Sequence, residues 1–577
     1  MRVVATAGHV DHGKSSLVQT LTGTNPDRLE EERVRGLTID IGFAHMSLPS
    51  GAGISFVDVP GHVRFIGNML AGVGGVDACL FVVAATEGWK PQSEEHLRIL
   101  ELIGLGHGII ALTKVDLVDD EWRQLQELDV RDRLAGTFLA DATIVPVSAT
   151  TGRGLDNLLD ALDILVGETP QARDRGRPRL WVDRVFAAKG SGTVVTGTLT
   201  GGSLHVDQQV HVTGRTARVR AVQSHGHSQP SIGPGNRVAL NLAGIEHSEL
   251  QRGHAVILAE QWRPTSRFDA SLQVLSSLRH QVTRRGAYLA YIGSGEFPVK
   301  LRVLGHDAIT PGGNGLVRVH LADALPLTPG DRFVLRESGR DETVGGGEVL
   351  DVAPVLPASK ARPDRSVDRV IAERGWVSAD DLEALTGERR APTLGEAVTS
   401  PEWLQAAQRE VRMRIEAAGD LGLGLAELDD RMRAVLSTLE DVAIEAERVR
   451  VAGAADPLDN HPFVAALLAG GVTPPDPGSL VRGELRALVR RNLIVERDGI
   501  YFHPSTIDTV ANTAARMLLV NPEGFTVAQL RDELGVSRKY ALPLVNELDA
   551  RGITRRRGDL RVAGPRLPSA DAGSAPA

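Results

Sequence analysis

Glycine, lysine and serine stand near the N-terminus at a spacing that suits phosphate binding. Four residues separate Gly8 from Gly13, and Lys14 and Ser15 follow at once. Backbone N–H groups of such a loop can surround a phosphate, while the lysine reaches the β and γ oxygens and the serine hydroxyl holds Mg²⁺. The residues predicted to bind a nucleotide here are Gly8, Asp11, His12, Gly13, Lys14, Ser15 and Ser16.

Two further segments supply groups that a bound triphosphate and its metal ion need. The apolar run 54–57 ends in Asp58, which is predicted to face the metal ion through water, and Gly61 can bring its N–H group to a γ-phosphate. Thr38 lies in a polar loop from which a hydroxyl can reach Mg²⁺. The predicted metal site therefore consists of Ser15, Thr38 and Asp58.

The segment Thr113-Lys114-Val-Asp116 indicates which base is bound. A carboxylate at Asp116 can accept hydrogen bonds from N1–H and the 2-amino group of guanine, whereas adenine would leave it desolvated and unpaired. A backbone N–H at Ser148 or Ala149 could meet O6 of guanine. GTP is therefore the predicted nucleotide, and its predicted base contacts are Thr113, Lys114, Asp116, Ser148 and Ala149.

These segments are connected by alternating strands and helices. Apolar runs indicate strands at 3–5, 44–48, 54–58, 80–84, 109–112 and 143–147. Helices are indicated at 16–21 and 91–102. The alternation predicts a doubly wound parallel sheet with the nucleotide at the carboxyl ends of its strands.

The composition is that of a globular protein with several domains. Its 577 residues suffice for roughly four or five domains, and no apolar run is long enough to span a bilayer. The net charge of −9 argues against a general nucleic-acid coat, so any RNA contact must be a local patch. The lone cysteine, Cys79, lies in an apolar run, and no signal peptide precedes the first strand; both predict a cytoplasmic protein without zinc or disulfides.

The rest of the chain changes pattern twice. Residues 178–357 contain short alternating strands separated by glycine turns, which predict two β-barrels. From 358 onward the pattern is helical: a short helix, a turn, a second helix and a hairpin recur three or four times. That recurrence predicts an array of winged helices.

The last copy of this pattern is the clearest. A helix from Thr526 is followed by Gly535 at the turn, by Ser537 as a candidate N-cap, and by a second helix in which Pro543 is expected to cause a kink or an early end. The apolar residues 541, 544, 545 and 548 of that helix face the core. The outward cations predicted to bind RNA are Arg538, Lys539, Arg555, Arg556 and Arg557.

The N-terminal region resembles the translational GTPases typified by elongation factor Tu. The shared phrases are Gly-His-Val-Asp-His-Gly-Lys at 8–14, Arg-Gly-Leu-Thr-Ile at 35–39 and Asp-Val-Pro-Gly-His at 58–62. The resemblance implies that His62 positions the attacking water and that Val10 and Ile39 form an apolar gate. One departure is Thr113, which replaces an asparagine whose amide ties the base loop to the P-loop, so a looser nucleotide clamp is expected.

Other phrases are similar to the selenocysteine-specific elongation factors, the SelB family. They are Thr38-Ile-Asp-Ile-Gly, Thr-Lys-Val-Asp at 113–116, Val-Asp-Arg at 182–184, Lys-Gly-Ser-Gly-Thr-Val-Val-Thr-Gly-Thr at 189–198, and the segment 235–244. In that family the first barrel holds the aminoacyl group, and the matching positions are Asp183, Arg184 and Arg237. A selenol is ionised at neutral pH and a serine hydroxyl is not, so two guanidiniums in a partly desolvated pocket favour the selenolate. Without the resemblance, solvated ion pairs at strand ends would explain these arginines better.

The predicted fold is multidomain, with an α/β P-loop GTPase domain, two β-barrels and a C-terminal winged-helix array. The predicted boundaries are 1–172 for the GTPase domain, 178–260 for the barrel with the aminoacyl pocket, and 261–357 for a tRNA-binding barrel. Winged helices are predicted at 365–420, 421–455, 456–508 and 509–566, followed by a disordered tail at 567–577.

The resemblance implies a monomeric, ribosome-stimulated GTPase that delivers selenocysteyl-tRNA to ribosomes paused at a UGA codon. Its cofactors would be GTP and Mg²⁺, and its last winged helix would bind an mRNA hairpin beside that codon. Two alternatives stay open. One is a translational GTPase with a different tRNA cargo, and the other is a GTP-switched DNA-binding regulator, because a winged helix usually binds DNA or other proteins.

Overall fold

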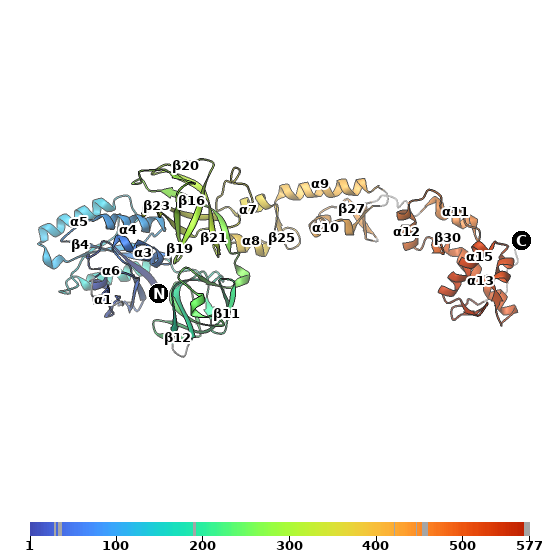
Figure 1. The fold of residues 1–577 in the computed structure, drawn as a ribbon, viewed down its shortest axis with the longest axis horizontal. Coiled ribbons are helices and arrows are strands. Elements are labelled where there is room, and N and C mark those ends of the chain that lie inside the picture. The colour runs from blue at the N-terminus through green and yellow to red at the C-terminus, as the bar shows by residue number, and fades with distance from the viewer. Residues whose placement is uncertain are drawn as a thin grey trace. The chain divides into compact units, whose positions relative to one another are not determined.

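The computed structural model describes residues 1–27, 31–32, 37–188, 192–419, 422–445, 447–452, 458 and 460–569. The chain divides into two units, Met1–Ser400 and Pro401–Ala577. Their elements are drawn in Figure 1. None of the described helices has the length and apolar character that crossing a membrane requires.

The first unit begins with a six-stranded sheet in the order β2-β3-β1-β4-β5-β6. Its strands are β1 (Arg2–Ala7), β2 (Gly42–Ser47), β3 (Gly53–Asp58), β4 (Ala78–Ala84), β5 (Gly108–Thr113) and β6 (Ile144–Pro146). All neighbours are parallel except β2, which pairs antiparallel with β3. The wholly parallel sheet predicted from the sequence is therefore wrong at this edge, because the short connection 48–52 permits only a hairpin.

Helices cover both faces of this sheet, as a doubly wound fold requires. They are α1 (Lys14–Thr22), α3 (Ile66–Val73), α4 (Pro91–Leu102), α5 (Asp120–Leu134) and α6 (Leu155–Glu168). One core contains Leu17 of α1 and Leu158 of α6, and a separate core contains Met69 of α3 and Leu97 of α4. The loops after β1, β3, β5 and β6 all leave the carboxyl edge of the sheet, so the predicted nucleotide residues meet at one edge.

Two six-stranded β-barrels follow, as predicted. The first has the order β10-β15-β7-β8-β14-β11 and closes through a β10–β11 pairing. Its strands are β7 (Arg179–Ala188), β8 (Gly192–Thr200), β10 (Gln209–Val212), β11 (Arg215–Ser224), β14 (Asn236–Ala243) and β15 (Ala255–Ile257), with β12 (His227–Gln229) extending β11.

The second barrel is closed in the order β16-β21-β19-β18-β22-β23. Its strands are β16 (Thr265–Val274), β18 (Tyr288–Ile292), β19 (Gly295–Leu304), β21 (Asn314–Leu325), β22 (Arg332–Glu337) and β23 (Glu342–Asp351). A small pair, β17 (Val282–Thr283) with β20 (Ala308–Ile309), lies beside it. The first unit then ends with α7 (Val367–Arg374), β24 (Trp376–Ser378), α8 (Ala379–Thr386) and β25 (Ala397–Thr399).

The second unit is built from helices and short hairpins. It starts with α9 (Pro401–Ala417), β26 (Leu423–Gly424), α10 (Asp430–Leu436), β27 (Val442–Glu445) and β28 (Arg448–Val451). Next come α11 (Pro462–Gly470), α12 (Arg482–Arg490), and the hairpin of β29 (Val495–Arg497) and β30 (Ile500–Phe502). The four winged-helix boundaries predicted from the sequence stay a proposal, but helix pairs with hairpins do recur along the array.

The last module has the predicted order of elements. They are α13 (Pro504–Val520), β31 (Phe525–Thr526), α14 (Val527–Leu534), α15 (Arg538–Ala550), β32 (Thr554–Arg557) and β33 (Leu560–Ala563). Gly535 ends α14 with a φ of 62°, as the predicted turn requires. Ser537 stands at the N-cap of α15, although its hydroxyl makes no capping bond.

Two expectations about this module are changed by the structure. Helix α15 continues past Pro543 to Ala550, so the early end predicted there is wrong. The carbonyl that the proline leaves unpaired belongs to Lys539, which is exposed and can be hydrated. Residues 570–577 of the predicted tail lie outside the described residues, and Leu567 packs against the core of the module.

Candidate functional site

The loop between β1 and α1 has the curvature that a phosphate cradle needs. Gly8, Asp11 and Gly13 have positive φ angles of 129°, 61° and 88°. A Cβ atom on Gly8 would lie 2.1 Å from the carbonyl oxygen of Val82, so only glycine fits there. Gly13 is the N-cap of α1 and provides no side-chain cap, which leaves the first N–H groups of the helix to a ligand. The loop therefore fits a phosphate.

Lys14 lies where the β and γ phosphates of such a ligand would be. Its amino group donates to the carbonyls of Gly8 and His9 at 3.0 and 2.7 Å. Burial lowers the pKa of Lys14 to about 8. A Cβ atom on Gly61 would lie 2.3 Å from this amino group, so the loop after β3 contacts Lys14 directly. The two groups predicted for the γ-phosphate are thus brought together.

The predicted metal ligands also meet. The hydroxyl of Ser15 lies 2.8 Å from the hydroxyl of Thr38 and donates to Asp58 at 2.6 Å. Thr6 donates to the other carboxylate oxygen of Asp58 at 2.7 Å. Burial raises the pKa of Asp58 to about 6. A cluster of hydroxyl and carboxylate oxygens matches the ligands that Mg²⁺ prefers. Asp27, which no motif in the sequence marks, also reaches this cluster and accepts from Thr38 at 2.8 Å.

The base-binding segments lie at the ends of β5 and β6. The hydroxyl of Thr113 donates to the carbonyl of His12 at 2.6 Å, so threonine does tie the base loop to the P-loop. The looser nucleotide clamp expected at Thr113 stays a prediction, although the threonine hydroxyl reaches the same loop. Lys114 adopts a φ of 57°, and the side chain of Asp116 is exposed to solvent. Ser148 is buried and its hydroxyl accepts from the N–H of Thr151 at 3.1 Å; Ala149 follows it.

His62 lies apart from the other residues of the predicted nucleotide site. Its Nδ1 accepts from the N–H of Arg64 at 3.2 Å, and its ring lies 5.9 Å from that of Phe65. Within the described residues no hydrogen bond joins His62 to the P-loop or to Asp58. Of the predicted gate, Val10 is held by Gln92 at 3.3 Å, and the carbonyl of Ile39 accepts from Asn68 at 2.8 Å.

A buried histidine that the sequence analysis missed supports the P-loop. Nδ1 of His96 on α4 accepts from the N–H of Gly8 at 3.1 Å. Burial lowers the pKa of His96 well below its usual value, so the ring is neutral with its proton on Nε2. Burial likewise lowers the pKa of His12 to about 3. The P-loop region therefore gains no positive charge from these two rings near pH 7.

Of the predicted aminoacyl residues, Arg237 lines a pocket between the N-terminal domain and the first barrel, together with Phe43 and Thr196. Asp183 and Arg184 do not line this pocket but contact residues that do. The β7–β8 register shifts between Val182 and Arg184, and this bulge turns Asp183 and Arg184 to the same side. Arg237 on β14 pairs with Asp183, with one nitrogen 3.1 Å from Oδ1. The guanidiniums of Arg184 and Arg237 lie 4.3 and 3.3 Å from the ring centre of Phe43 on β2. The pocket has a volume of about 280 Å³.

The arginine that lines this pocket is partly neutralised. Arg237 pairs with Asp183, which is only 8% exposed. Thr196 donates to Asp183 at 2.6 Å, which occupies that carboxylate further. An added anion would be attracted by the guanidinium of Arg237, whereas a neutral group would not. Phe43 was missed because no sequence spacing relates it to the barrel.

The pocket is joined to the predicted metal-binding segment by arginines. Arg184 donates to the carbonyl of Ile41. Arg252 donates to Asp40 at 2.7 Å, to the side chain of Asn68 at 2.9 Å and to the carbonyl of Asp183 at 3.1 Å. Residues 38–43 thus run from the metal site to the wall of the pocket.

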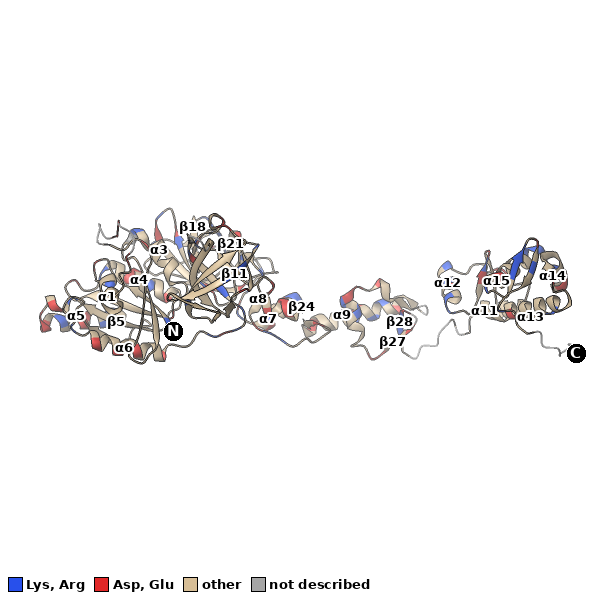
Figure 2. Cartoon of the chain, turned by 90° about the horizontal axis from the view of Figure 1, so that it is seen from below, with Lys and Arg blue, Asp and Glu red and all other residues tan. Residues whose placement is uncertain are grey.

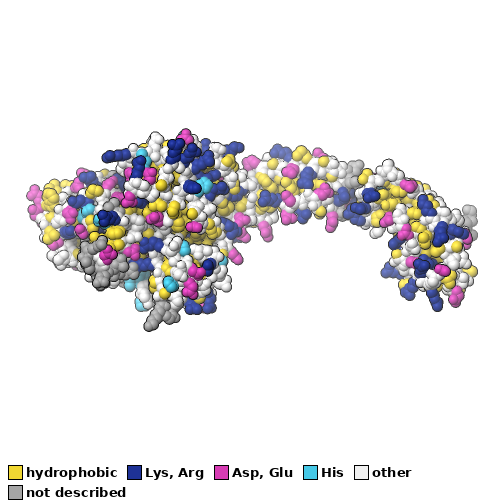
Figure 3. Space-filling view, viewed as in Figure 1, with side chains coloured by type: hydrophobic (Ala, Val, Ile, Leu, Met, Phe, Trp, Pro, Cys, Tyr) yellow, Lys and Arg dark blue, Asp and Glu magenta, His cyan; other side chains and the backbone are white. Residues whose placement is uncertain are grey.

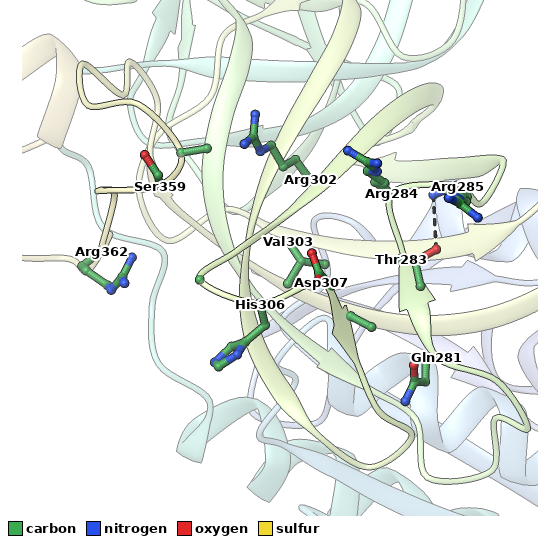
Figure 4. Close-up of a pocket in the computed structure, with 13 residues that line it drawn as sticks. Gln281, Thr283, Arg284, Arg285, Arg302, Val303, His306, Asp307, Ser359 and Arg362 are labelled. Carbon is green, nitrogen blue, oxygen red and sulfur yellow. Dashed lines mark hydrogen bonds between the residues drawn. The ribbon is translucent and has the colours of Figure 1, made fainter.

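A basic groove lies on the second barrel. It has a volume of about 820 Å³ and is lined by Arg284, Arg285, Arg302 and Arg362, together with His306 and Asp307 (Figure 4). These four arginines are exposed, and within the described residues none forms an ion pair with an acid. Figure 3 shows Lys and Arg side chains gathered over β20, next to this groove.

Within the part of the chain that the structure describes, the predicted RNA-binding cations of the last module have no acid partners. Arg538 and Lys539 occupy the exposed start of α15, and Arg555, Arg556 and Arg557 are the exposed residues of β32. Arg556 donates a side-chain hydrogen bond to the carbonyl of Gly558 at 3.1 Å. Other arginines of the module pair with acids, as Arg561 does with Asp549 at 2.6 Å.

Two protein-family models match this chain, one near each end. The family model described as the elongation factor Tu GTP binding domain matches residues 1–168. The model described as the elongation factor SelB winged helix matches residues 517–563.

Two relatives and one solved structure show how far the similarity extends along the chain. The selenocysteine-specific elongation factor of Escherichia coli (strain K12) is 30% identical, over 96% of this chain and 98% of that protein. The selenocysteine-specific elongation factor of Desulfomicrobium baculatum is 41% identical over 60% of this chain, and the match spans 55% of that relative's length. A crystal structure of the bacterial selenocysteine-specific elongation factor EF-Sec is 26% identical, with a TM-score of 0.74 over 97% of this chain and 99% of that one.

The tie made by Thr113 gives a first prediction. Thr113→Val keeps the shape but leaves the carbonyl of His12 without its donor, which costs about 1 to 3 kcal/mol for a buried polar group. GTP and GDP binding should weaken roughly 5- to 150-fold, as measured by fluorescence titration with a labelled nucleotide. Thr113→Ser keeps the hydroxyl and is the matched control. Equal affinities for the Val and Ser variants would show that the tie does not position the base loop.

The charges around the metal site give a second prediction. Mg²⁺-dependent GTP binding should weaken as the pH falls below about 6, because Asp58 takes up a proton. It should weaken again above about pH 8, because Lys14 loses one. Each limb should approach about tenfold per pH unit, measured as affinity against pH. The acidic limb should diminish in Asp58→Asn, which separates it from protonation of the nucleotide itself; an unchanged limb would refute the assignment.

Proposed function

Because the chain belongs to the family of selenocysteine-specific elongation factors, which are translational GTPases, we propose that it delivers selenocysteyl-tRNA to the ribosome at UGA codons in its GTP-bound form. The proposal rests on one segment that contributes both to the metal site and to the wall of the pocket. Residues 38–43 supply both Thr38 to the metal site and Phe43 to the pocket of Arg184 and Arg237. A nucleotide that orders Thr38 would thereby shape the pocket for its cargo.

The N-terminal domain holds GTP and Mg²⁺. The loop from Gly8 to Ser16 would cradle the phosphates, with Lys14 and Gly61 near the γ-phosphate. Ser15 and Thr38 would contact Mg²⁺, with Asp58 acting through water. The bound metal ion supplies charge compensation for the triphosphate. Asp116, with Lys114 and the backbone of residues 148–149, would select guanine.

Hydrolysis is proposed to depend on His62 and on contact with the ribosome. In this structure the His62 ring packs beside Phe65 and its Nδ1 accepts from Arg64. The proposal therefore requires a rotation of His62 toward the nucleotide, past Val10 and Ile39. Such a requirement would hold the intrinsic rate low until the ribosome acts.

The pocket of the first barrel would favour a selenolate over a hydroxyl. A selenolate would bring a negative charge near the guanidiniums of Arg184 and Arg237, whereas serine brings none. The aromatic face of Phe43 keeps water from one side of both guanidiniums and strengthens the interaction. A different tRNA cargo would not need two guanidiniums at this place, which argues against the first alternative.

RNA contacts are proposed at two further places. The arginine groove of the second barrel would follow the phosphates of the tRNA, because its guanidiniums have no acid partners within the described residues. The last winged helix would bind an mRNA hairpin through Arg538 and Lys539 on its second helix and Arg555 to Arg557 on its wing. A DNA-binding regulator would need no aminoacyl pocket, and this argues against the second alternative.

The cargo pocket gives a third prediction. Arg184→Ala or Arg237→Ala should weaken binding of selenocysteyl-tRNA by about 1.5 to 3 kcal/mol, or roughly 10- to 150-fold, while GTP affinity changes little. Binding would be measured by filter retention with a non-hydrolysable GTP analogue and with selenocysteyl- or seryl-tRNA. Arg220→Ala, an exposed arginine on the same barrel, is the control. Equal losses for the two tRNAs would assign these arginines to the tRNA backbone.

The last winged helix gives a fourth prediction. In the full chain, Arg538→Ala with Lys539→Ala should remove the preference for an mRNA segment following an in-frame UGA over the same segment with a scrambled loop, at roughly 1 to 3 kcal/mol for each contact. Replacing Arg555 to Arg557 by alanine should instead weaken binding of every RNA and flatten its salt dependence by about 0.7 to 0.9 per lost contact. Tighter binding of duplex DNA than of the hairpin would contradict the proposal.

A further inference from the structure

The module before the last one carries a stripe of arginines that nothing neutralises. Arg482, Arg486 and Arg490 are four residues apart on α12, so they share one face over about 12 Å of helix. All three are exposed, and within the described residues none of them pairs with an acid. Figure 2 shows the basic residues of α12 in blue.

This stripe does not stabilise the helix that carries it. Cations four residues apart repel each other, and Arg482 is the first residue of α12, where the helix dipole disfavours a positive charge. By contrast, Arg497 in the same module donates to Glu547 at 2.8 Å. An external polyanion would relieve the repulsion among these three cations.

The wing of the module turns the stripe into a groove. Glu496 and Tyr501 are cross-strand partners on β29 and β30, and with α12 they enclose about 500 Å³. Glu496 is the single acid in this groove, and its carboxylate accepts from the N–H of Gly499 at 3.1 Å. Three guanidiniums against one carboxylate leave a clear positive excess. A second helix with a wing is also the face by which such modules contact nucleic acid.

The groove is fixed relative to the last module. Arg497 and Asp498, at the turn of the wing, bond to Glu547 and Asn546 of α15, the second contact at 2.8 Å. Phe502 of β30 is fully buried in one core with Leu544 and Val545 of α15. The wing of one module is thus packed on the second helix of the next, so an RNA held by α15 meets α12 at a set distance.

We propose that the α12 groove, formed by Arg482, Arg486, Arg490 and Tyr501, binds the phosphate backbone of the RNA stem whose loop is held by the last module. Apart from Glu496 and Tyr501, the polar side chains that line the groove are three guanidiniums, and no amide side chain lines it. We therefore expect its RNA contacts to be independent of sequence. The location of the loop rests on the function proposed above, but the groove's affinity for stem RNA does not.

The test compares hairpin RNAs that share one loop and differ by one helical turn of stem. Wild-type full-length protein should bind the longer hairpin more tightly. The triple variant Arg482→Gln, Arg486→Gln, Arg490→Gln should lose that gain, and its salt slope on the long hairpin should fall by about 2 to 3. Its preference between cognate and scrambled loops should stay as in the wild type.

A control variant removes the same charge from arginines that already face acids. Arg389, Arg412 and Arg531 each pair with a carboxylate, and their replacement by Gln should leave the gain from the longer stem intact. The inference is overturned if the α12 variant keeps the wild-type gain and slope, if it loses equally on the short hairpin, or if the wild-type groove favours duplex DNA over the RNA stem.

The two proposals fail separately. If the wild type shows no preference between cognate and scrambled loops, the proposed reading of the hairpin loop is wrong. If the gain from the longer stem still depends on α12 in that case, the proposed role of the α12 groove remains supported. Thermal unfolding of each variant checks that the module is folded, and Arg486→Gln alone, which removes the central charge, replaces the triple variant should that one unfold.

Discussion

The proposed coupling of the nucleotide site to the cargo pocket depends on the guanidinium of Arg252. It donates to Asp40 in the segment that carries Thr38, to Asn68 of α3 and to the carbonyl of Asp183 beside the proposed aminoacyl pocket. Asn68 in turn donates to the carbonyl of Ile39 at 2.8 Å. A planar fork with five donors can satisfy three acceptors in fixed directions, which the single ammonium of a lysine cannot do. A shift of the segment that carries Thr38 must therefore disturb the fork and the pocket together.

The size of this coupling can be bounded. Hydrogen bonds to charged groups contribute about 1.5 to 3 kcal/mol each, and the value at Arg252 is lower because its side chain is 30% exposed and solvent screens it. Allosteric coupling between two binding sites is typically about 1 to 3 kcal/mol. One fork plus the bond from Arg184 to Ile41 would thus be enough to make the proposed cargo binding depend on the nucleotide. No large rearrangement of the barrels is needed for that dependence.

The sequence predicted the local chemistry well because the motifs are local. Lys14, Ser15 and Asp58 follow their strands at fixed spacing, so the sheet alone brings them together. Phe43, Asp27, His96 and Arg252 could not be found this way, because each acts across a contact between segments far apart in the chain. The bond from Thr113 to the P-loop could not be predicted for a related reason: whether a hydroxyl can replace an amide there depends on how close β5 lies to the P-loop. The antiparallel edge strand, by contrast, was visible in the short connection before β3.

Pairing also explains how a chain of net charge −9 could hold RNA as proposed. Several of its buried arginines are matched by acids: Arg318 pairs with Asp269 at 2.6 Å, and Arg561 with Asp549 at 2.6 Å. Within the described residues, the arginines of the α12 groove and of the groove on the second barrel have no such match. The field at an RNA backbone is set by charges within about 10 Å at moderate salt, so distant acids hardly weaken these surfaces. RNA affinity should therefore follow local pairing, and net charge says little about it.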